Sequence, residues 1–536
     1  MNTTMIITTA LIVCFFALMI GIGVRSRKHA TDVNGFVLGS RSVGPWLSAF
    51  AFGTSYFSAV IFVGYAGQFG WNFGLASTWI GLGNAFIGSL LAWLVLGRRT
   101  RIMTQAIGSK TMPDFFGARY QSKGLKIAAS VITFVFLIPY TASLFNGLSR
   151  LFSMAYNGID YSVCVIVMSV LTGIYVLIGG YMATAINDFI QGIIMLAGIT
   201  AVILAVLKAN GGLLEATHSL AMVEGAKGWE GAGAFTAFLG PDPLFLLFVV
   251  ILTSLGTWGL PQMVGKFYAI KNEDSIKKGT IISTFFAIVV AGGCYFLGGF
   301  GRLFSNVIEI DAKTGKPAGG FDSIIPTMLS TLSPVLIAVV IVLVLSASMS
   351  TLSSLVLTSG STVTLDLIAP LRKKDMSEKS KMLIMRLLIV VFIVISATIA
   401  IFQVSSKSEI TKYIAQMMGV SWGALAGAFL APFLYGLYWK KTTKAAVVVS
   451  FIYGVGLEII QLLLAFGVFS FPQGSFLADV VFKTSLHSGS FAMVGGLIIV
   501  PIVSLLTQKT RPQGADEMFE CYNTTKTVGI TDSLGE

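Results

Sequence analysis

Long runs of apolar residues, separated by short polar stretches, dominate the chain of 536 residues. A helix needs roughly 20 apolar residues to cross the hydrocarbon core of a membrane, and the hydropathy pattern predicts about thirteen such helices. The predicted ranges are 5–24, 45–68, 75–97, 127–154, 161–179, 184–207, 243–262, 280–301, 329–358, 383–404, 411–437, 443–466 and 489–507. The pattern therefore predicts an all-α integral membrane protein.

Composition supports this prediction, because 55% of the residues are hydrophobic, only 11% are charged and the mean hydropathy is +0.84. Soluble proteins carry about a quarter of charged residues. The first apolar run, 5–24, lacks the basic start and the small-residue cleavage site of a signal peptide, so we expect it to be a retained span. The protein should be embedded in a lipid bilayer.

The basic residues predict a topology. If successive loops alternate sides, about three quarters of the 36 Lys and Arg residues fall on one side. By the positive-inside rule the N-terminus is outside and the C-terminus is cytoplasmic, which requires an odd number of spans. The formal net charge of +12 is then a property of membrane-facing loops rather than of a nucleic-acid surface. The compact loops and the lack of a targeting segment favour the plasma (inner) membrane of a bacterium.

Several functional classes are disfavoured by residues that the sequence lacks. The four cysteines have no paired spacing, and the three histidines fall in predicted loops without forming a cluster, which argues against a metal centre. There is no phosphate-binding loop for ATP. The predicted spans hold no convergent acid, base and nucleophile, so we expect neither an enzyme nor an organic cofactor.

Six hydroxyl residues in nine follow the most apolar run, in the segment from Ser346 to Ser354. On a helix, four positions share one face: Ala347, Ser350, Thr351 and Ser354. Serine and threonine in membrane helices often bond back to their own helix or allow close packing. A cluster of this size instead suits a hard monovalent cation, which prefers oxygen ligands.

Such a site needs further oxygens from a second helix, ideally carbonyls freed by a break. Residues 50–59 are a candidate, because Gly53 weakens the helix and the hydroxyls of Thr54, Ser55 and Ser58 compete for backbone groups. On this segment alone, glycine and serine for close helix packing are an equally good explanation.

In a third segment, 178–191, the glycines at 179 and 180 predict a tight turn between spans. Asp188 lies about one turn inside the next span. An acid at such depth suggests function, and the alternative is an interfacial Asp paired with a Lys or Arg of a loop. Glu458, the other clear acid in a span, belongs to no motif.

Together these motifs resemble one family, the sodium:solute symporters. The resemblance covers residues 30 to 445 and rests on Gly35-Phe-Val-Leu-Gly-Ser-Arg-Ser-Val-Gly-Pro45, on Gly-Gly-Tyr with Asp188 and Gln191, and on the Ala347–Ser354 pattern. It implies two inverted five-helix repeats at 45–208 and 243–437, preceded by an extra helix and loop at 1–44. Two helices at 438–507 and a cytoplasmic tail at 508–536 would follow. The second broken helix would span 253–261, where Gly256, Gly259 and Pro261 weaken the helix.

The resemblance also implies the ions. A first sodium would bind the carbonyls of Thr54, Phe57 and Ala347 and the hydroxyls of Ser350 and Thr351. A second would use Asp188, Ser350, Ser353 and Ser354, giving two sodium ions per cycle. Proline carriers of the family have an Asp where this chain has Tyr56, which leaves the choice of sodium over protons open.

The expected cargo is a small organic solute at the midplane. Its predicted contacts are Ser58, Ala59, Tyr140, Thr253, Thr257, Trp258 and Gln416. No Lys, Arg or Glu falls at the predicted midplane, which favours a small amino acid such as proline, or a monocarboxylate, over a sugar. Pantothenate or sugar carriers, a solute sensor of the same fold and a sodium channel are the alternatives. The functional unit is expected to be a monomer.

Overall fold

The computed structural model describes residues 3–156, 159–226, 228–311, 316–372, 375–403 and 414–524. Helices make up its regular structure, and within these ranges the β-type pairing is confined to two isolated bridges, Val43 with Ile270 and Ile310 with Pro317. The ends of two predicted helices, residue 404 and residues 411–413, and the part of the tail after 524 lie outside the described residues.

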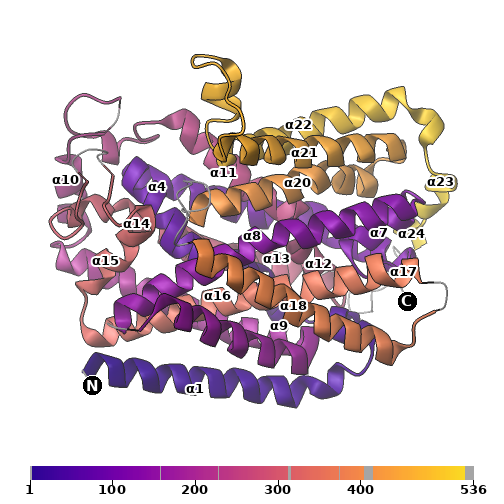
Figure 1. The fold of residues 1–536 in the computed structure, drawn as a ribbon, viewed down its shortest axis with the longest axis horizontal. Coiled ribbons are helices and arrows are strands. Elements are labelled where there is room, and N and C mark those ends of the chain that lie inside the picture. Colours follow the sequence, from indigo (N-terminus) through magenta and orange to yellow (C-terminus); the bar gives the residue numbers. More distant parts are fainter. Residues whose placement is uncertain are drawn as a thin grey trace.

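The long helices run roughly parallel to one another, as Figure 1 shows. The principal helices are α1 (Thr3–Ser26), α3 (Pro45–Tyr56), α4 (Ala66–Phe73), α5 (Thr78–Gly83), α6 (Arg98–Ala106), α8 (Lys123–Ala155), α9 (Tyr161–Ala209), α11 (Pro243–Gly259), α12 (Pro261–Tyr268), α13 (Glu273–Ala287), α14 (Gly293–Gly299), α16 (Pro334–Thr362), α18 (Glu378–Gln403), α20 (Ile414–Tyr438), α21 (Lys444–Ala465) and α22 (Ser485–Leu506). The shorter ones are α2 (Val33–Leu38), α7 (Met112–Arg119), α10 (Leu213–Ala221), α15 (Ile324–Ser330), α17 (Ala369–Leu371), α23 (Ala515–Met518) and α24 (Cys521–Thr524). Short 3-10 and π segments join several of them, among them the π segments η3 (Val60–Tyr65) and η5 (Asn84–Leu91).

By length and hydropathy, ten helices among the described residues are able to cross a membrane, or eleven if the bent pair α11–α12 is one span. The predicted count of about thirteen is not reached by this measure. One reason is that Val60–Ala106 counts as one helical stretch of 47 residues, although Gly74, with φ of 59° and ψ of −138°, breaks it between two predicted spans. Another is that Tyr161–Ile174 is shorter than a full span.

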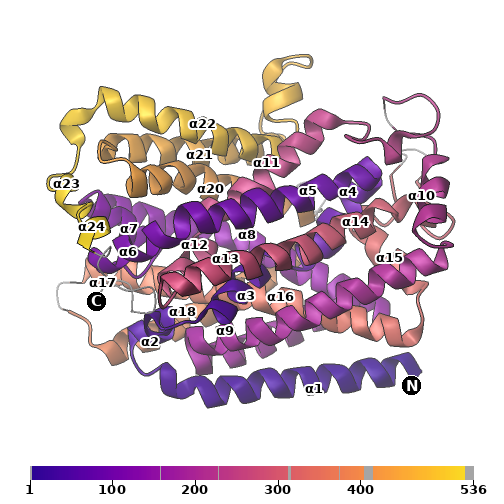
Figure 2. The ribbon, with the colours of Figure 1, turned by 180° about the vertical axis from the view of Figure 1, so that it is seen from behind.

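The helices form layers between two outer edges. Helix α1 lies along one edge, and α20, α21 and α22 gather at the opposite edge (Figures 1 and 2). Between them pack α3, α8, α9, α13 and α16, whose inner residues form one continuous buried core. Helix α16 is most enclosed around its middle, where 15 consecutive residues from Leu343 to Leu357 are buried. The hydroxyl-rich segment therefore lies inside the bundle and faces protein.

The chain bends sharply at Gly180, where non-helical dihedrals interrupt α9 at the tight turn that the two glycines predict. Gly180 has φ of 57° and ψ of −153°, a conformation that L side chains rarely adopt. A Cβ on Gly180 would lie 2.8 Å from the Phe36 ring and 3.0 Å from the Phe36 carbonyl oxygen. The double glycine thus allows α2 to approach the kink of α9.

One expectation about histidine is wrong. His487 lies within α22, with 2% of its surface exposed, and its ring stacks on Phe245 with centroids 5.1 Å apart. Its Nδ1 is 2.8 Å from the Thr484 hydroxyl. Because the span begins at Ser485 rather than at residue 489, the histidine that we placed in a loop belongs to the first turn of a helix.

Candidate functional site

The first element of the candidate site is the end of α3. The helix stops at Tyr56, and Phe57 adopts extended dihedrals of −86° and 124°. The Thr54 hydroxyl donates to the Phe50 carbonyl at 2.8 Å, and the Ser55 hydroxyl donates to the Ala51 carbonyl at 2.6 Å. These bonds compete with the helical ladder. The helical path resumes in η3, so the sequence-based expectation of a break within residues 50–59 agrees with the observed backbone.

The hydroxyls of α16 meet the oxygens that this break exposes. The Ser350 hydroxyl lies 3.0 Å from the Thr54 carbonyl oxygen and 2.9 Å from that of Ala347. The Thr351 hydroxyl lies 3.2 Å from the carbonyl oxygens of Thr54, Phe57 and Ala347. All five residues are fully buried. The structure therefore brings together the complete set of oxygens predicted for the first ion.

This arrangement fits a sodium ion chemically. Its donors are three carbonyl oxygens and two hydroxyl oxygens, with no nitrogen or sulfur, and hard cations prefer such ligands. Carbonyls at an interrupted helix are a common way of coordinating sodium in transporters. The hydroxyl protons that point at the carbonyls would have to turn away when an ion binds.

The residues predicted for a second ion surround a lysine side chain. Lys266 of α12 is only 4% exposed, and its Nζ donates to the Ser354 hydroxyl at 2.9 Å. The same Nζ lies 3.6 Å from the Asp188 carboxylate, which is fully buried. Ser353 is turned to its own helix, where its hydroxyl donates to the Ser350 carbonyl at 2.8 Å. The alternative explanation of Asp188, a pairing with a basic residue, is thus observed, but both partners are buried rather than interfacial.

Around the broken helix, three aromatic side chains form a second polar cluster. The rings of Tyr56 and Tyr140 lie 5.8 Å and 5.9 Å from that of Trp422. The Tyr140 hydroxyl is near Ser58 and the Trp422 indole. In the part of the chain that the structure describes, neither the Tyr140 hydroxyl nor the indole N–H completes a hydrogen bond. Buried polar atoms without a partner are costly, so they mark a place where a polar solute could bind.

The two neighbouring positions predicted for the solute lie at this cluster. Ser58 caps the resumed helix, its hydroxyl accepting from the Val60 N–H at 3.2 Å. Ala59 packs against α8, where a Cβ on Gly147 would lie 3.1 Å from the Ala59 Cβ. Thus Ser58, Ala59 and Tyr140 lie near one another.

The other predicted solute contacts use their polar groups for hydrogen bonds within the protein, and Thr257 also lines a small cavity with Tyr56 and Phe57. Thr253 donates to the Val249 carbonyl of its own helix at 2.9 Å. Thr257 and Trp258 donate to carbonyls of η5, those of Gly88 and Ile87, at 2.8 Å and 2.9 Å. The Gln416 side-chain oxygen accepts from the Ser485 hydroxyl at 2.8 Å. The side chains of Thr257, Trp258 and Gln416 thus connect separate helical segments, whereas that of Thr253 bonds within α11.

The second broken helix contributes in a different way. Helices α11 and α12 meet at Leu260 with a bend of 44°. Gly256, just before the bend, adjoins Trp422, because a Cβ there would lie 2.5 Å from the indole ring. The bend also directs α12, with Lys266, toward α16. Trp422 and Lys266 were both missed by the sequence analysis, although a lysine within six residues of Pro261 and a tryptophan in a glycine-rich span were visible signals.

The motif from Gly35 to Pro45 forms a clamp at one end of the bundle. The Arg41 guanidinium donates to the carbonyls of Thr104, Ser109 and Tyr268 at 3.3, 2.6 and 3.2 Å. Burial lowers the pKa of Arg41 to about 10 because removal of water penalises its charged form. The side chain remains charged at neutral pH and joins α2 to the α6–α7 loop and to α12.

Comparison with known proteins decides the family. The model of the sodium:solute symporter family matches residues 36–454. The chain belongs to this family. Its curated relatives include the osmoregulated proline transporter OpuE of Bacillus subtilis, 28% identical over 449 residues, which are 83% of this chain and 87% of that protein. A sodium/proline symporter of Staphylococcus aureus strain RF122 / ET3-1 is 29% identical over 462 residues, covering 84% of this chain and 85% of the relative.

Solved structures agree on the fold of this symporter. A sodium-coupled sialic acid symporter in a substrate-bound outward-open state superposes with a TM-score of 0.70 at 17% identity, covering 93% of this chain and 98% of the other. MHP1, a nucleobase-cation-symport-1 family transporter, gives a TM-score of 0.50 at 14% identity, with 91% and 98% covered. The family and the relatives make the protein a multi-pass membrane transporter of the sodium:solute symporter type, and not an enzyme.

Proposed function

We propose that this symporter carries a small solute with a single carboxylate, with proline as the first candidate, into the cell together with sodium. The observation that carries the proposal is the meeting of five buried oxygens from the α3 break and α16. Proline is suggested by what the two relatives are named for. A monocarboxylate fits the same pocket chemistry, and Tyr56, where proline carriers of the family have an Asp, distinguishes this chain from them.

The sodium site consists of the carbonyls of Thr54, Phe57 and Ala347 and the hydroxyls of Ser350 and Thr351. The ion would hold α3 to α16, because each helix supplies part of its ligands. Entry of one positive charge provides about 2.3 kcal/mol per 100 mV of membrane potential. For this energy to drive uptake, sodium must bind one conformation more tightly than the other. An ion that bridges two helices has this property if the helices separate during the cycle.

The solute would bind beside the ion, between Ser58, Tyr140 and Trp422. The unpaired Tyr140 hydroxyl and Trp422 indole N–H are hydrogen-bond donors for a carboxylate. The amide end of the resumed helix at η3 adds a positive partial charge. Thr257, Trp258 and Gln416 would act mainly by holding the surrounding helices in place, while Thr253 bonds within its own helix.

The orientation and the repeat architecture are part of the same proposal. The C-terminal helices α23 and α24 lie at the same end of the bundle as α2, α6, α7 and α17 (Figure 2). The loops at this end carry most of the basic residues, so we assign it to the cytoplasm and the N-terminus to the outside of the plasma membrane. Residues 45–208 and 243–437 would form inverted repeats, with a broken helix in each. Because the two termini lie on opposite sides, the chain crosses the membrane an odd number of times. The proposed transporting unit is a monomer.

The test is an uptake screen in proteoliposomes with labelled proline, other amino acids, acetate, pyruvate, pantothenate and glucose. An inward sodium gradient should drive concentrative uptake of proline or of one close analogue, and replacement of sodium by potassium should abolish it. If no solute accumulates although the protein binds sodium, a sensor of the same fold becomes the better explanation.

A further inference from the structure

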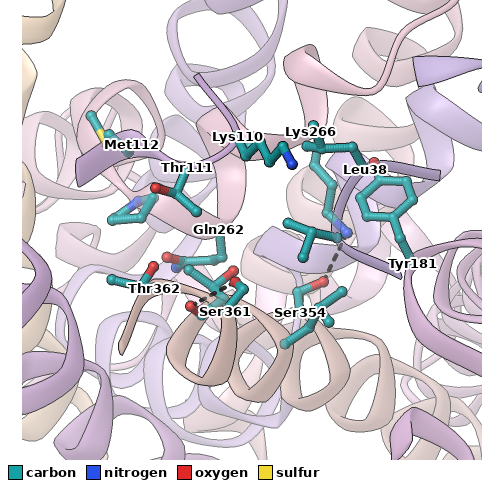
Figure 3. A pocket seen from close by; sticks show the side chains of 15 residues that line it. Leu38, Lys110, Thr111, Met112, Tyr181, Gln262, Lys266, Ser354, Ser361 and Thr362 are labelled. Carbon is teal, nitrogen blue, oxygen red and sulfur yellow. Dashed lines mark hydrogen bonds between the residues drawn. The ribbon is translucent and has the colours of Figure 1, made fainter. Parts of the chain in front are cut away.

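A buried ammonium group lies close to the proposed sodium site. Lys266 reaches from α12 toward α16, where its Nζ donates to the Ser354 hydroxyl, as the dashed line in Figure 3 shows. Its Nζ also lies 5.2 Å from the centre of the Tyr181 ring, a distance compatible with a cation–π contact. Together with Lys110 and Gln262, Lys266 lines a cavity of about 50 Å³ (Figure 3). A basic amine thus lies at this level of the bundle, within reach of a carboxylate and a hydroxyl.

The hydroxyls around the ammonium form a chain with one direction. Since Ser354 accepts from Lys266, its own proton is free to be donated to the Ser55 hydroxyl, 2.8 Å away. Ser55 in turn donates to the Ala51 carbonyl at 2.6 Å. Every proton in this chain points away from Lys266. The lone pairs of Ser354 are thereby directed at the place where the cation lies.

The ammonium also supplies the counter-charge of Asp188. Both carboxylate oxygens are buried and form no hydrogen bond with other described residues. Among the described residues, Lys266 is the basic side chain that forms an ion pair with this carboxylate, at 3.6 Å. An unpaired buried carboxylate is strongly unfavourable, whereas a paired one is tolerated. A sodium ion added to the Asp188–Lys266 pair would leave an uncompensated positive charge in the protein interior.

The lysine lies one helical turn from the proposed sodium. Ser354 follows Ser350 by four residues on α16, and Ser55 follows Thr54 on α3. One turn of an α-helix rises about 5.4 Å. Two positive charges would therefore lie between α3 and α16. The first is the bound sodium ion, and the second is the Lys266 ammonium of α12.

We infer that the Lys266 ammonium is a built-in cation that occupies the place where Asp188 and Ser354 would otherwise hold a second sodium ion. The inference rests on the proposed function and sharpens it, because it limits the carrier to one sodium ion per transport cycle. It revises the two ions expected from the sequence: the ligands of the second ion are present, but their cation is already bound to the chain.

The test counts sodium ions on the purified full-length protein by equilibrium binding of ²²Na⁺, which requires no knowledge of the solute. Wild type should bind one ion with a Hill coefficient near one. Lys266→Met, which keeps the length of the side chain but removes its charge, should bind two. Lys266→Arg is the matched control and should bind one. Adding Asp188→Asn to Lys266→Met should return the count to one.

Two ions bound to wild type, or an unchanged count in folded Lys266→Met, would overturn the inference. Folding of each variant is checked by monodisperse elution and by retention of the first ion. If Lys266→Met does not fold, the wild-type count decides, since two ions are incompatible with an occupied second position. Failure of the proposed function gives a different result from failure of this inference. In that case Thr351→Val would not reduce the amount of sodium that the protein binds.

Discussion

Removal of the Thr351 hydroxyl is the most direct perturbation of the proposed sodium site. This hydroxyl lies 3.2 Å from each of three carbonyl oxygens, those of Thr54, Phe57 and Ala347. Thr351→Val keeps the shape of the side chain and removes one of the five proposed ligands. Hydrogen bonds and polar contacts to charged groups contribute about 1.5–3 kcal/mol. At 1.4 kcal/mol per factor of ten, sodium affinity should fall by about 10- to 150-fold.

Sodium binding to the purified protein is the readout, followed by the sodium concentration that gives half-maximal solute uptake. Thr351→Ser retains the hydroxyl and should stay within about threefold of wild type. Ser348→Ala is the second control: Ser348 is buried on the same helix, but its hydroxyl has no partner in the described part of the chain. A sodium affinity in folded Thr351→Val within twofold of wild type, or an equal loss in Ser348→Ala, would refute the assignment.

Three further outcomes are expected. Gly180→Ala should destabilise the protein by about 1–3 kcal/mol, because φ of 57° is strained for alanine and the new Cβ meets Phe36. Thermal unfolding in detergent measures this loss of stability. Gly173→Ala is the control, because its Cβ would make only an ordinary contact at 3.5 Å. Tyr140→Phe should weaken solute binding by about 2- to 12-fold through loss of one neutral hydrogen bond, while ²²Na⁺ binding stays unchanged. An equal loss of solute affinity and sodium affinity would place Tyr140 at the ion instead. Asp322 is fully buried in the α14–α15 connection, and burial raises the pKa of its carboxyl above 3.8. The folded state therefore binds this proton more tightly than the unfolded state, so stability falls as the pH rises above that value. Asp322→Asn should unfold at a higher temperature than wild type at pH 7 but not near pH 4. A stabilisation of Asp322→Asn that does not depend on pH would contradict this reasoning.

Much of the architecture could be predicted from the chain, because the bilayer imposes a local rule. A span must be apolar over its whole length, so hydropathy alone placed helices near their observed positions. The break after Tyr56 was also visible locally, since Gly53, Thr54 and Ser55 weaken the helix through contacts within four residues. The family resemblance then assigned Ser350 and Thr351 to the same ion as Thr54.

The number of separate spans was less predictable, because helix continuity depends on the turns between apolar runs. Val60–Ala106 counts as one helical stretch although Gly74, with φ of 59° and ψ of −138°, breaks it between two predicted spans, and Gly180 breaks α9 between two more. Likewise, Thr257 and Gln416 are polar residues in suitable spans, but their hydrogen bonds go to η5 and α22 rather than to a common pocket. Hydropathy does not report toward which neighbour a side chain turns.

What the sequence by itself determined is the class of protein, the positions of its apolar helices and the local signals for a broken helix beside a hydroxyl-rich one. Only the tertiary structure decided which charges meet. Lys266 is a loop lysine by hydropathy, yet the bend after Gly259 carries it to Ser354, 88 residues away in sequence, and to Asp188. The physical reason is that a buried charge is stable only beside its counter-charge, and that partner is selected by helix packing between distant segments of the chain.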